Sequence, residues 1–217
     1  MNDIILISYL AGSSGQFLEH FLMKHDGIFK KEQTRLYKTN EWAVSYADLY
    51  DKNNCIFLEE LRDGKSYVRG TDEEIDYILN NQFDIGTDTL TISCHELEKN
   101  YKLENKNVSI LGIDVEDNIS KKYIRNLYIL KENWRWDHIG NADNLTNFYK
   151  DYESGITSQN VPYYFINYKK FFIDQELDEY INLCKFLNIK SNIKMYMKNI
   201  DYYMYENDRL LDEHKLL

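Results

Sequence analysis

The stretch ISYLAGSSGQFLEHFL, residues 7–22, decides the fold of this chain. Apolar residues run up to Leu10, small residues fill positions 11–15, and an amphipathic segment follows. This order predicts a buried strand, a tight turn and a helix. We expect the strand at 3–9 and the helix at 15–25. Turns of this kind often hold a phosphate or a sulfate, so the first question is whether the loop binds an anion.

Later segments repeat the alternation of strand and helix. Three further runs have the β-rich composition of strands. They are residues 88–96, 107–114 and 162–168. In the first half, the pattern also predicts a short strand at 55–58, a helix at 42–50 and a helix that begins at Thr71.

Two helices of the second half are predicted from apolar residues at helical spacing. The helix at 116–131 is expected to turn four residues inward: Ile119, Tyr123, Leu127 and Leu130. Asp174 is expected to cap the other helix, whose inward residues are Leu177, Tyr180, Ile181, Cys184 and Leu187. From residue 191 the tail is expected to be helical and polar.

Strands that alternate with helices predict an α/β fold. We expect residues 1–217 to form a single domain, with a mostly parallel central sheet flanked by helices on both faces as a three-layer sandwich. Ligands of such sheets bind at the carboxyl ends of the strands. Two loops are expected at that edge: the loop after the strand at 3–9 and the loop that begins at Cys94 and His95.

Composition limits the class of protein. The chain has 217 residues, of which 43% are hydrophobic and 29% charged, which is typical of a globular protein. The net charge of −10 argues against general nucleic-acid binding, because the phosphate backbone would be repelled. The apolar run from Ile4 to Ala11 lacks the positive region of a signal peptide, and no run is long enough to cross a bilayer. Three cysteines without a C-x-x-C pair indicate reduced thiols, so we expect a cytoplasmic protein.

The loop itself supports two interpretations equally. Gly12 and Gly15 permit backbone angles that are closed to most residues, while Ser13 and Ser14 offer hydroxyl donors. The helix that follows points unpaired N–H groups and its positive dipole end at the loop, which makes an anion site without a charged side chain. The other interpretation is a strand-to-helix turn whose polar groups are satisfied within the protein.

Spacing excludes several known loops. The Walker pattern fails because Phe17 stands where its second glycine belongs and no lysine follows, and G-x-G-x-x-G fails as well. A serine-hydrolase elbow, G-x-S-x-G, fits Gly12 and Ser14 but needs glycine where Gln16 stands. A hydrolase therefore stays open as a minor hypothesis.

Two later segments add to the loop: TISCHELEK at 91–99 and INYKKFFIDQELDEYINLCKFLNI at 166–189. Together the three resemble the sulfotransferase family, whose P-loop-type fold uses phosphoadenosine phosphosulfate as the sulfuryl donor. The resemblance covers strand order and spacing over most of the chain. It implies transfer of a sulfuryl group to a hydroxyl or amine of a small-molecule or glycan acceptor.

The resemblance also implies roles for individual residues. The loop from Gly12 to Phe17 matches the phosphosulfate loop, with Gly12, Ser13, Ser14, Gly15, Gln16 and Phe17 as its members. His95 matches the catalytic base that removes a proton from the acceptor, and Ser120 matches the serine that binds the 3′-phosphate. Residues 168–172 match the family's Tyr-Glu-Asp-Leu segment, with lysines at 169 and 170 in place of its acidic pair.

Departures from the family pattern keep a second function open. The loop has no Lys or Arg, and no Arg stands near Gly112, where the family's 3′-phosphate arginine falls. Multiply charged donors held only by neutral groups bind weakly. The alternative is a catalytically degenerate nucleotide- or anion-binding module of the same fold.

The histidines and cysteines do not predict a metal site. Cys94 and His95 are neighbours on a strand, so they point to opposite faces and seldom chelate one ion together. His95 also has a purely structural interpretation, as a strand-end histidine that is hydrogen-bonded to the backbone. His20 and His25 miss the i, i+4 spacing of one helix face and are expected to be solvated.

Overall fold

A computed structural model describes residues 3–10, 13–28, 31–32, 56–57, 88–94, 103, 107–131 and 142–215. Its centre is a four-stranded sheet in the order β4-β1-β5-β6, and every pair of neighbouring strands is parallel. The strands are β1 (Ile4–Ser8), β4 (Leu90–Cys94), β5 (Val108–Asp114) and β6 (Tyr163–Asn167). A second, two-stranded parallel sheet pairs β2 (Lys31–Glu32) with β3 (Ile56–Phe57). The predicted strands are confirmed, and the helices expected at 42–50 and from Thr71 lie outside the described residues.

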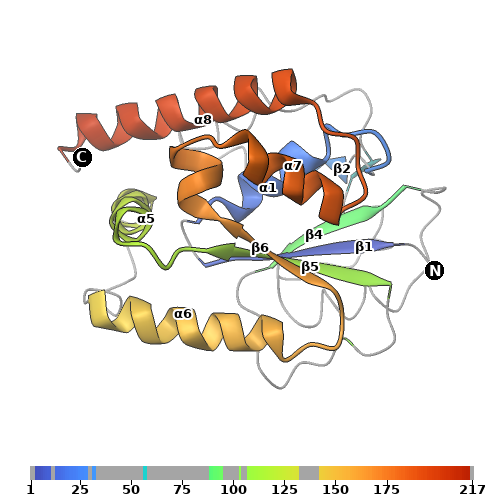
Figure 1. The fold of residues 1–217 in the computed structure, drawn as a ribbon. Coiled ribbons are helices and arrows are strands. Elements are labelled where there is room, and N and C mark those ends of the chain that lie inside the picture. The colour runs from blue at the N-terminus through green and yellow to red at the C-terminus, as the bar shows by residue number, and fades with distance from the viewer. Residues whose placement is uncertain are drawn as a thin grey trace.

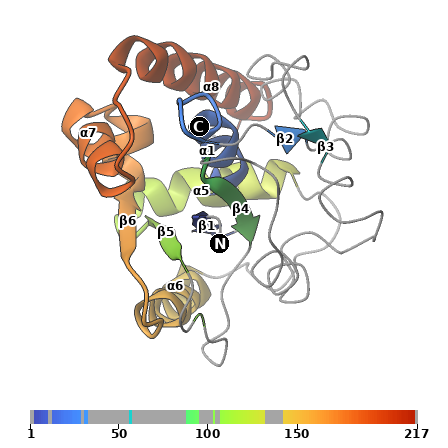
Figure 2. The ribbon, with the colours of Figure 1, turned by 90° about the vertical axis from the view of Figure 1, so that its right-hand side faces the viewer.

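Helices cover both faces of the central sheet (Figure 1). Their bounds are α1 (Gly15–Leu22), α5 (Asn118–Lys131), α6 (Ala142–Thr157), the π-helix η3 (Lys169–Ile173), α7 (Leu177–Phe186) and α8 (Ile193–Glu213). Helix α6 lies on one face, and α1, α7 and α8 lie on the other. Figures 1 and 2 together show α5 running across the end of the sheet at which the strands finish. The α/β class and the helices on both faces are thus confirmed.

Strand β1 lies inside the sheet, between β4 and β5. All five of its residues are buried, which explains the uninterrupted apolar run in the sequence, because a strand covered on both faces has no polar side. Helix α1 follows β1 after a short loop and packs its aromatic face on the same core. Phe17 and Phe21 stack at 6.0 Å and are both fully buried. The local pattern of residues 7–22 therefore places the loop at the centre of the fold.

The buried face of α5 agrees with the prediction at Leu127 and at Tyr123, which packs on the core, but differs at the start of the helix; the side chain of Leu130 lies outside the described residues. Ile119 is 55% exposed, whereas Ser120, Ile124 and Leu127 are buried at the i, i+4, i+7 spacing of one face. The prediction was wrong by one residue at the start of the helix. Asp117 explains the difference, because its carboxylate fixes the first turn and directs Ser120 inward.

The entry to α7 also differs from the prediction. Glu176, not Asp174, precedes the first helical residue, and neither side chain caps the helix. Asp174 instead ends the π-helix η3 and forms an ion pair with Lys169. Leu177 is 38% exposed rather than inward. A π-helix was not expected from the sequence, since its wider turn has no simple apolar period.

The tail after residue 191 forms the longest described helix, α8. The helix is confirmed, but the prediction that it is polar was wrong, because one face is apolar and packs on α1 and η3. Five of its residues are fully buried or nearly so: Tyr196, Ile200, Tyr203, Met204 and Leu211. No described helix is both long and apolar enough to cross a membrane.

Candidate functional site

Two loops leave the same edge of the sheet, as the sequence predicted. Strands β1 and β4 are parallel, and their last residues, Ser8 and Cys94, are partners in the register. The ladder continues one step further, since the Tyr9 N–H donates to the Cys94 carbonyl at 3.1 Å. The chain therefore reaches residue 95 at the edge where the loop after β1 begins. His95 and Gly12 themselves lie outside the described residues.

This edge contains the topological switch point of the sheet. The chain leaves β1 for α1 on one face, and it leaves β5 for a connection whose α6 covers the other face (Figure 1). Because β1 and β5 are neighbours, their connections diverge at their carboxyl ends. Ligands of open parallel sheets bind at such switch points.

Tyr152 joins β1 and β5 at the point where they separate. Its hydroxyl donates to the Ser8 carbonyl at 2.7 Å and accepts from the Ile113 N–H, also at 2.7 Å. It thereby satisfies both strands where they separate, beyond the Ile7–Leu111 pair that ends their ladder. The side chain is 1% exposed. A ligand at the switch point would lie above this phenol rather than between the strands.

The hydroxyls of the loop point into the protein. Both the Ser13 N–H and the Ser13 Oγ donate to the Leu10 carbonyl, at 2.9 and 2.6 Å. Ser14 Oγ accepts from the Tyr203 hydroxyl at 2.7 Å and lies 3.4 Å from the Tyr168 hydroxyl. Because these bonds hold both serine side chains inside the protein, any anion at this loop is left with backbone donors.

The backbone donors are the first amides of α1. Ser14, at φ 67°, is left-handed and turns the chain into the helix. The first bond of the helix runs from the Leu18 N–H to the Ser14 carbonyl at 3.0 Å. The amides of Gly15, Gln16 and Phe17 precede this bond, so they have no acceptor within the helix. They point out of the helix end at the carboxyl edge of β1.

Gly15 is required by the close approach of Tyr9. A Cβ at residue 15 would lie 2.1 Å from two ring atoms of Tyr9, which is far inside van der Waals contact. Phe17 is fully buried and stacks on Tyr203 with ring centroids 4.1 Å apart. Of the predicted loop members, Phe17 therefore offers a ligand only its N–H.

The second predicted phosphate contact, Ser120, lies in the first turn of α5. Its hydroxyl is fully buried and has no hydrogen-bond partner. The Asp117 carboxylate accepts from the N–H groups of Ile119 and Ser120 at 3.0 and 2.8 Å. An internal carboxylate thus occupies the anion-binding end of α5, and its charge opposes a phosphate at Ser120.

Carboxylates dominate the described surroundings of this edge. Asp114, the last residue of β5, accepts from the Tyr149 hydroxyl, the Asn167 side-chain amide and the Glu116 N–H. Burial, together with the charge of Asp114, raises the pKa of Tyr149 well above its usual value. This phenol therefore remains a donor. In the described part of the chain, no hydrogen bond or ion pair joins residues 13–17 to a Lys or Arg.

A second phenol cluster lies behind the loop. Tyr123 of α5 donates to Asp208 of α8 at 2.7 Å, and its ring centroid lies 6.4 Å from that of Tyr168. Burial is the main cause that raises the pKa values of Tyr123 and Tyr168. The loop and the segment at 168–172, which carry the most specific parts of the sequence resemblance, are therefore in contact through Ser14 and Tyr168.

Glu19 fixes α1 to β4 close to the predicted base. It is fully buried, and the Ser93 hydroxyl donates to its carboxylate at 2.5 Å. Ser93 stands two residues before His95 in the sequence. The bond therefore couples the position of the helix that carries the loop to the end of the strand that leads to His95.

The sequence reasoning missed Tyr152 and Asp117. Asp117 has a visible signal, because an Asp directly before a helix is a common N-cap. Tyr152 has none, since 144 residues separate it from Ser8. His20 and His25 were expected to be solvated, but they are 3% and 4% exposed, and that prediction was wrong.

Comparison with known proteins does not assign the chain to a family. No protein-family model matches the chain, and a search of curated proteins finds no significant relative. Within the residues that the structure describes, no group of three or more His, Cys, Asp and Glu side chains forms a metal site.

Proposed function

We propose that the chain binds a nucleotide through its phosphate or phosphosulfate group at the N-terminus of α1. One observation carries this proposal: the amides of Gly15, Gln16 and Phe17 begin a helix at the switch point of a parallel sheet. A helix N-terminus at this position combines unpaired N–H donors with a positive dipole end. The P-loop-like, sulfotransferase-like sandwich suggested by the sequence agrees with this placement.

The reaction that we propose for this site is sulfuryl transfer from phosphoadenosine phosphosulfate. An acceptor hydroxyl or amine would attack the sulfur, the bond from sulfur to the bridging oxygen would break, and adenosine 3′,5′-bisphosphate would leave. His95 would take the proton of the acceptor as general base. Support comes from the shared end of β1 and β4, since Cys94, the residue before His95, pairs with Ser8.

A binding module without catalysis is the second candidate, and two observations favour it. The described contacts of the loop include no cation, and Asp117 stands at the α5 N-terminus beside Ser120. Both features weaken the hold on a multiply charged donor. We therefore expect weak nucleotide binding, whichever of the two functions holds.

The hydrolase hypothesis receives less support. A nucleophilic serine must be exposed at the top of a strand-to-helix turn and lie beside a base. Ser14 is 4% exposed and accepts a hydrogen bond from the Tyr203 hydroxyl. The described partners of its hydroxyl are the phenols of Tyr168 and Tyr203, and neither is a histidine or carboxylate base of the kind that activates a nucleophilic serine.

Opposite charges at residue 16 test the binding proposal. Gln16 occupies the second position of α1, and Gln16→Lys restores a cation to the loop while Gln16→Glu adds an anion. Calorimetric titration with adenosine 3′,5′-bisphosphate should show affinity that rises about tenfold in the first variant and falls about tenfold in the second.

Helix stability provides the matched control for this pair. A carboxylate in the first turn stabilises a helix by about 0.3–1 kcal/mol, and a lysine there does the opposite. Binding and stability should therefore change in opposite directions. Equal affinities in all three proteins, with the expected stability changes present, would show that the α1 N-terminus does not hold the nucleotide.

A further inference from the structure

A cleft lined by lysines lies at the far end of α1 from the loop. It has a volume of about 790 Å³ and is lined by Lys24 after α1 and by residues at the start of α8. We call it the lysine cleft. Its lining residues are Lys24, Asn192, Lys194, Met195, Lys198, Asn199, Asp201 and Tyr202. An adjoining hollow of about 490 Å³ shares Lys24 and adds Lys190.

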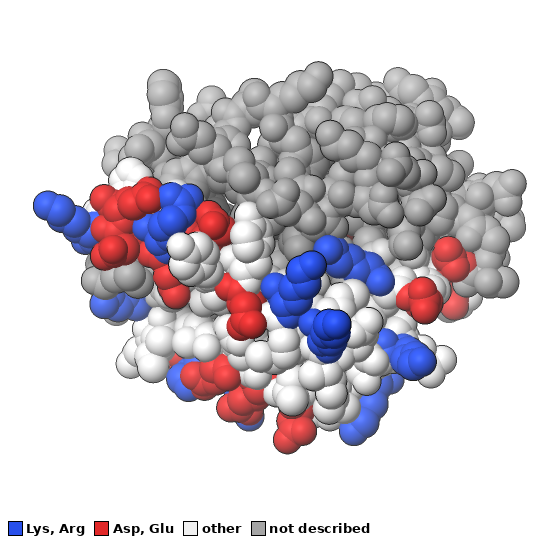
Figure 3. Space-filling model, turned by 90° about the horizontal axis from the view of Figure 1, so that it is seen from above, with Lys and Arg blue, Asp and Glu red and all other residues white. Residues whose placement is uncertain are grey.

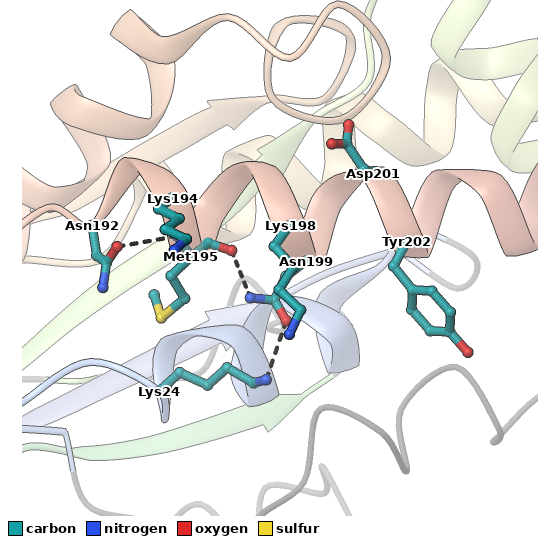
Figure 4. Close-up of a pocket in the computed structure, with 8 residues that line it drawn as sticks. All are labelled: Lys24, Asn192, Lys194, Met195, Lys198, Asn199, Asp201 and Tyr202. Carbon is teal, nitrogen blue, oxygen red and sulfur yellow. Dashed lines mark hydrogen bonds between the residues drawn. The ribbon is translucent and has the colours of Figure 1, made fainter.

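The cations of the lysine cleft come from two segments that face each other. Figure 4 shows Lys24 reaching across to Asn199 on α8. Its ammonium donates to Asn199 Oδ1 at 3.1 Å, and the Asn199 amide is itself fixed by a 2.6 Å bond to the Met195 carbonyl. Lys194 and Lys198 are one turn apart on α8, so they lie on one side of the helix. Asp201, three residues beyond Lys198, lies on the same side of α8 and also lines the cleft, so the lysines face one carboxylate there.

The lysines of the cleft and of the adjoining hollow lack ion-pair partners among the described residues. In the described part of the chain, Lys24, Lys190, Lys194 and Lys198 form no ion pair with a carboxylate. Burial, and then the charge of Lys198, lowers the pKa of Lys24, which indicates that the two ammoniums repel each other. Among the described lining residues, three lysines stand against one carboxylate, Asp201, in the cleft, and Asp26 lines the adjoining hollow with Lys24 and Lys190, so cations are in excess although the net charge of the chain is −10.

The position on α8 adds to this unbalanced charge. The first turn of α8 contains no acidic residue, although carboxylates are favoured at a helix N-terminus and lysines are disfavoured. Figure 3 shows blue Lys and Arg side chains gathered over the middle of this face, while red carboxylates group towards the end of α8. The repulsion is a cost that an anionic ligand would remove.

We propose that the lysine cleft binds a soluble organic anion that carries two or more phosphate groups. Lysine ammoniums are point charges that suit phosphate oxygens, and three of them line one cleft. The volume is within the range of small-molecule sites, and Met195 offers an apolar wall for the organic part of the ligand. A concave site favours a free molecule over a flat membrane surface.

This site is separate from the α1 N-terminus. Helix α1 has eight residues, so its two ends are about 12 Å apart. The proposal for the lysine cleft therefore does not depend on the proposed function. A ligand at one end of α1 leaves the other end free.

Titration with inorganic tripolyphosphate tests the proposal. The full chain should bind it, and the double variant Lys194→Gln, Lys198→Gln should weaken binding about tenfold or more. Lys185→Gln on α7, an exposed lysine outside the cleft, is the matched control and should change affinity less than twofold. The loss caused by the double variant should be the same in a Gln16→Glu background, because residue 16 lies at the opposite end of α1.

Three results would overturn the proposal. They are the absence of tripolyphosphate binding to the wild-type chain, equal binding by the double variant and the wild type, and an equal loss in Lys185→Gln. An experiment with lipid vesicles distinguishes a soluble phosphate ligand from a lipid headgroup. Sedimentation with phosphoinositide vesicles that is lost in the double variant, while soluble tripolyphosphate does not bind the wild-type chain, would assign the cleft to lipid headgroups and contradict a soluble ligand.

Discussion

The two ends of helix α1 offer an anion opposite kinds of site. At its N-terminus, the donors are backbone amides, the serine hydroxyls are turned inward, and the neighbouring charges are carboxylates. At its C-terminus, Lys24 shares a cleft with Lys194 and Lys198, and these cations form no ion pair in the described part of the chain. The N-terminal end has the backbone geometry of an anion site but no cation beside it. The C-terminal end has several lysines but no known anion-binding loop.

This difference separates recognition by shape from recognition by charge. Backbone amides at a helix end fix the position of an anion, but as neutral donors they bind it less strongly than charged groups do. Affinity at such a site therefore depends on nearby cations. Surface lysines attract an anion through their full positive charge. They place it less accurately, because their long side chains are flexible. The loop therefore suits a reacting group that must be placed accurately, and the lysine cleft suits a tightly held polyanion.

The largest effect is expected for His95→Ala, which tests whether the N-terminal end of α1 is a catalytic site. If sulfuryl transfer occurs there, removal of the base should lower the rate about a hundred- to ten-thousandfold. Binding of adenosine 3′,5′-bisphosphate should stay unchanged, since the base faces the acceptor. An assay with radiolabelled donor measures the rate of transfer, and calorimetry measures the affinity for adenosine 3′,5′-bisphosphate. Lower stability without a selective kinetic defect would leave His95 a structural residue.

Gly15→Ala is expected to disrupt the loop and spare the lysine cleft. The added Cβ would overlap the Tyr9 ring, and overpacking of a core typically costs about 1–3 kcal/mol. Chemical denaturation measures this loss. Gly27→Ala is the comparison, because residue 27 has φ 81° but no atom within 4 Å of its added Cβ. Tripolyphosphate affinity should be unchanged in both, and a loss in Gly15→Ala would contradict the independence of the two ends.

Tyr152→Phe tests the two hydrogen bonds that join β1 and β5, with an expected effect of similar size. The change leaves the Ser8 carbonyl and the Ile113 N–H without their shared partner, and a buried polar group without a partner costs about 1–3 kcal/mol. Tyr205→Phe, at a 64% exposed tyrosine, is the control and should be neutral. If both variants unfold at the same denaturant concentration, Tyr152 does not hold the strands together.

The smallest effect is a pH dependence at the lysine end. His25 contacts the Leu22 carbonyl through Nδ1 and the Tyr180 hydroxyl through Nε2, at 3.2 and 3.0 Å. Burial lowers its pKa below the ordinary value of 6.5, although the Leu22 and Phe21 carbonyls and Asp26 partly oppose this. The unfolded chain then binds more protons, so this contribution to stability is present above pH 6.5 and is lost as the pH falls through the lowered pKa.

Thermal unfolding between neutral and mildly acidic pH measures this dependence. His25→Gln should have a flatter profile than the wild type over that range. Identical slopes in the two proteins would show that His25 titrates alike in the folded and unfolded chain.

The sequence predicted the elements better than their details. The strands were found because Ile4–Ser8 and Val108–Asp114 are buried runs with a clear composition. The exposed Ile119 and the entry to α7 were missed because side-chain contacts decide them. Asp117 fixes one helix start, and the Lys169–Asp174 pair belongs to a π-helix. Such contacts override a simple apolar period.

The candidate site was predictable only in part. The loop was recognisable because its residues are contiguous, and the common edge of β1 and β4 follows from parallel strands. The inward turn of Ser14 was not, since it depends on Tyr168 and Tyr203, which are more than 150 positions away. The lysine cleft has no local pattern either, because Lys24 and Asn199 are 175 positions apart.

A nuclear magnetic resonance titration of the isotope-labelled chain with adenosine 3′,5′-bisphosphate tests the central claim most directly, since each amide reports separately. We predict that the largest shifts fall on the amides of Gly15, Gln16 and Phe17, whose N–H groups begin α1. Those shifts should saturate at the affinity found by calorimetry and shrink in Gln16→Glu. Shifts confined to Lys24, Met195 and Asn199, or no shifts at residues 15–17, would contradict the account.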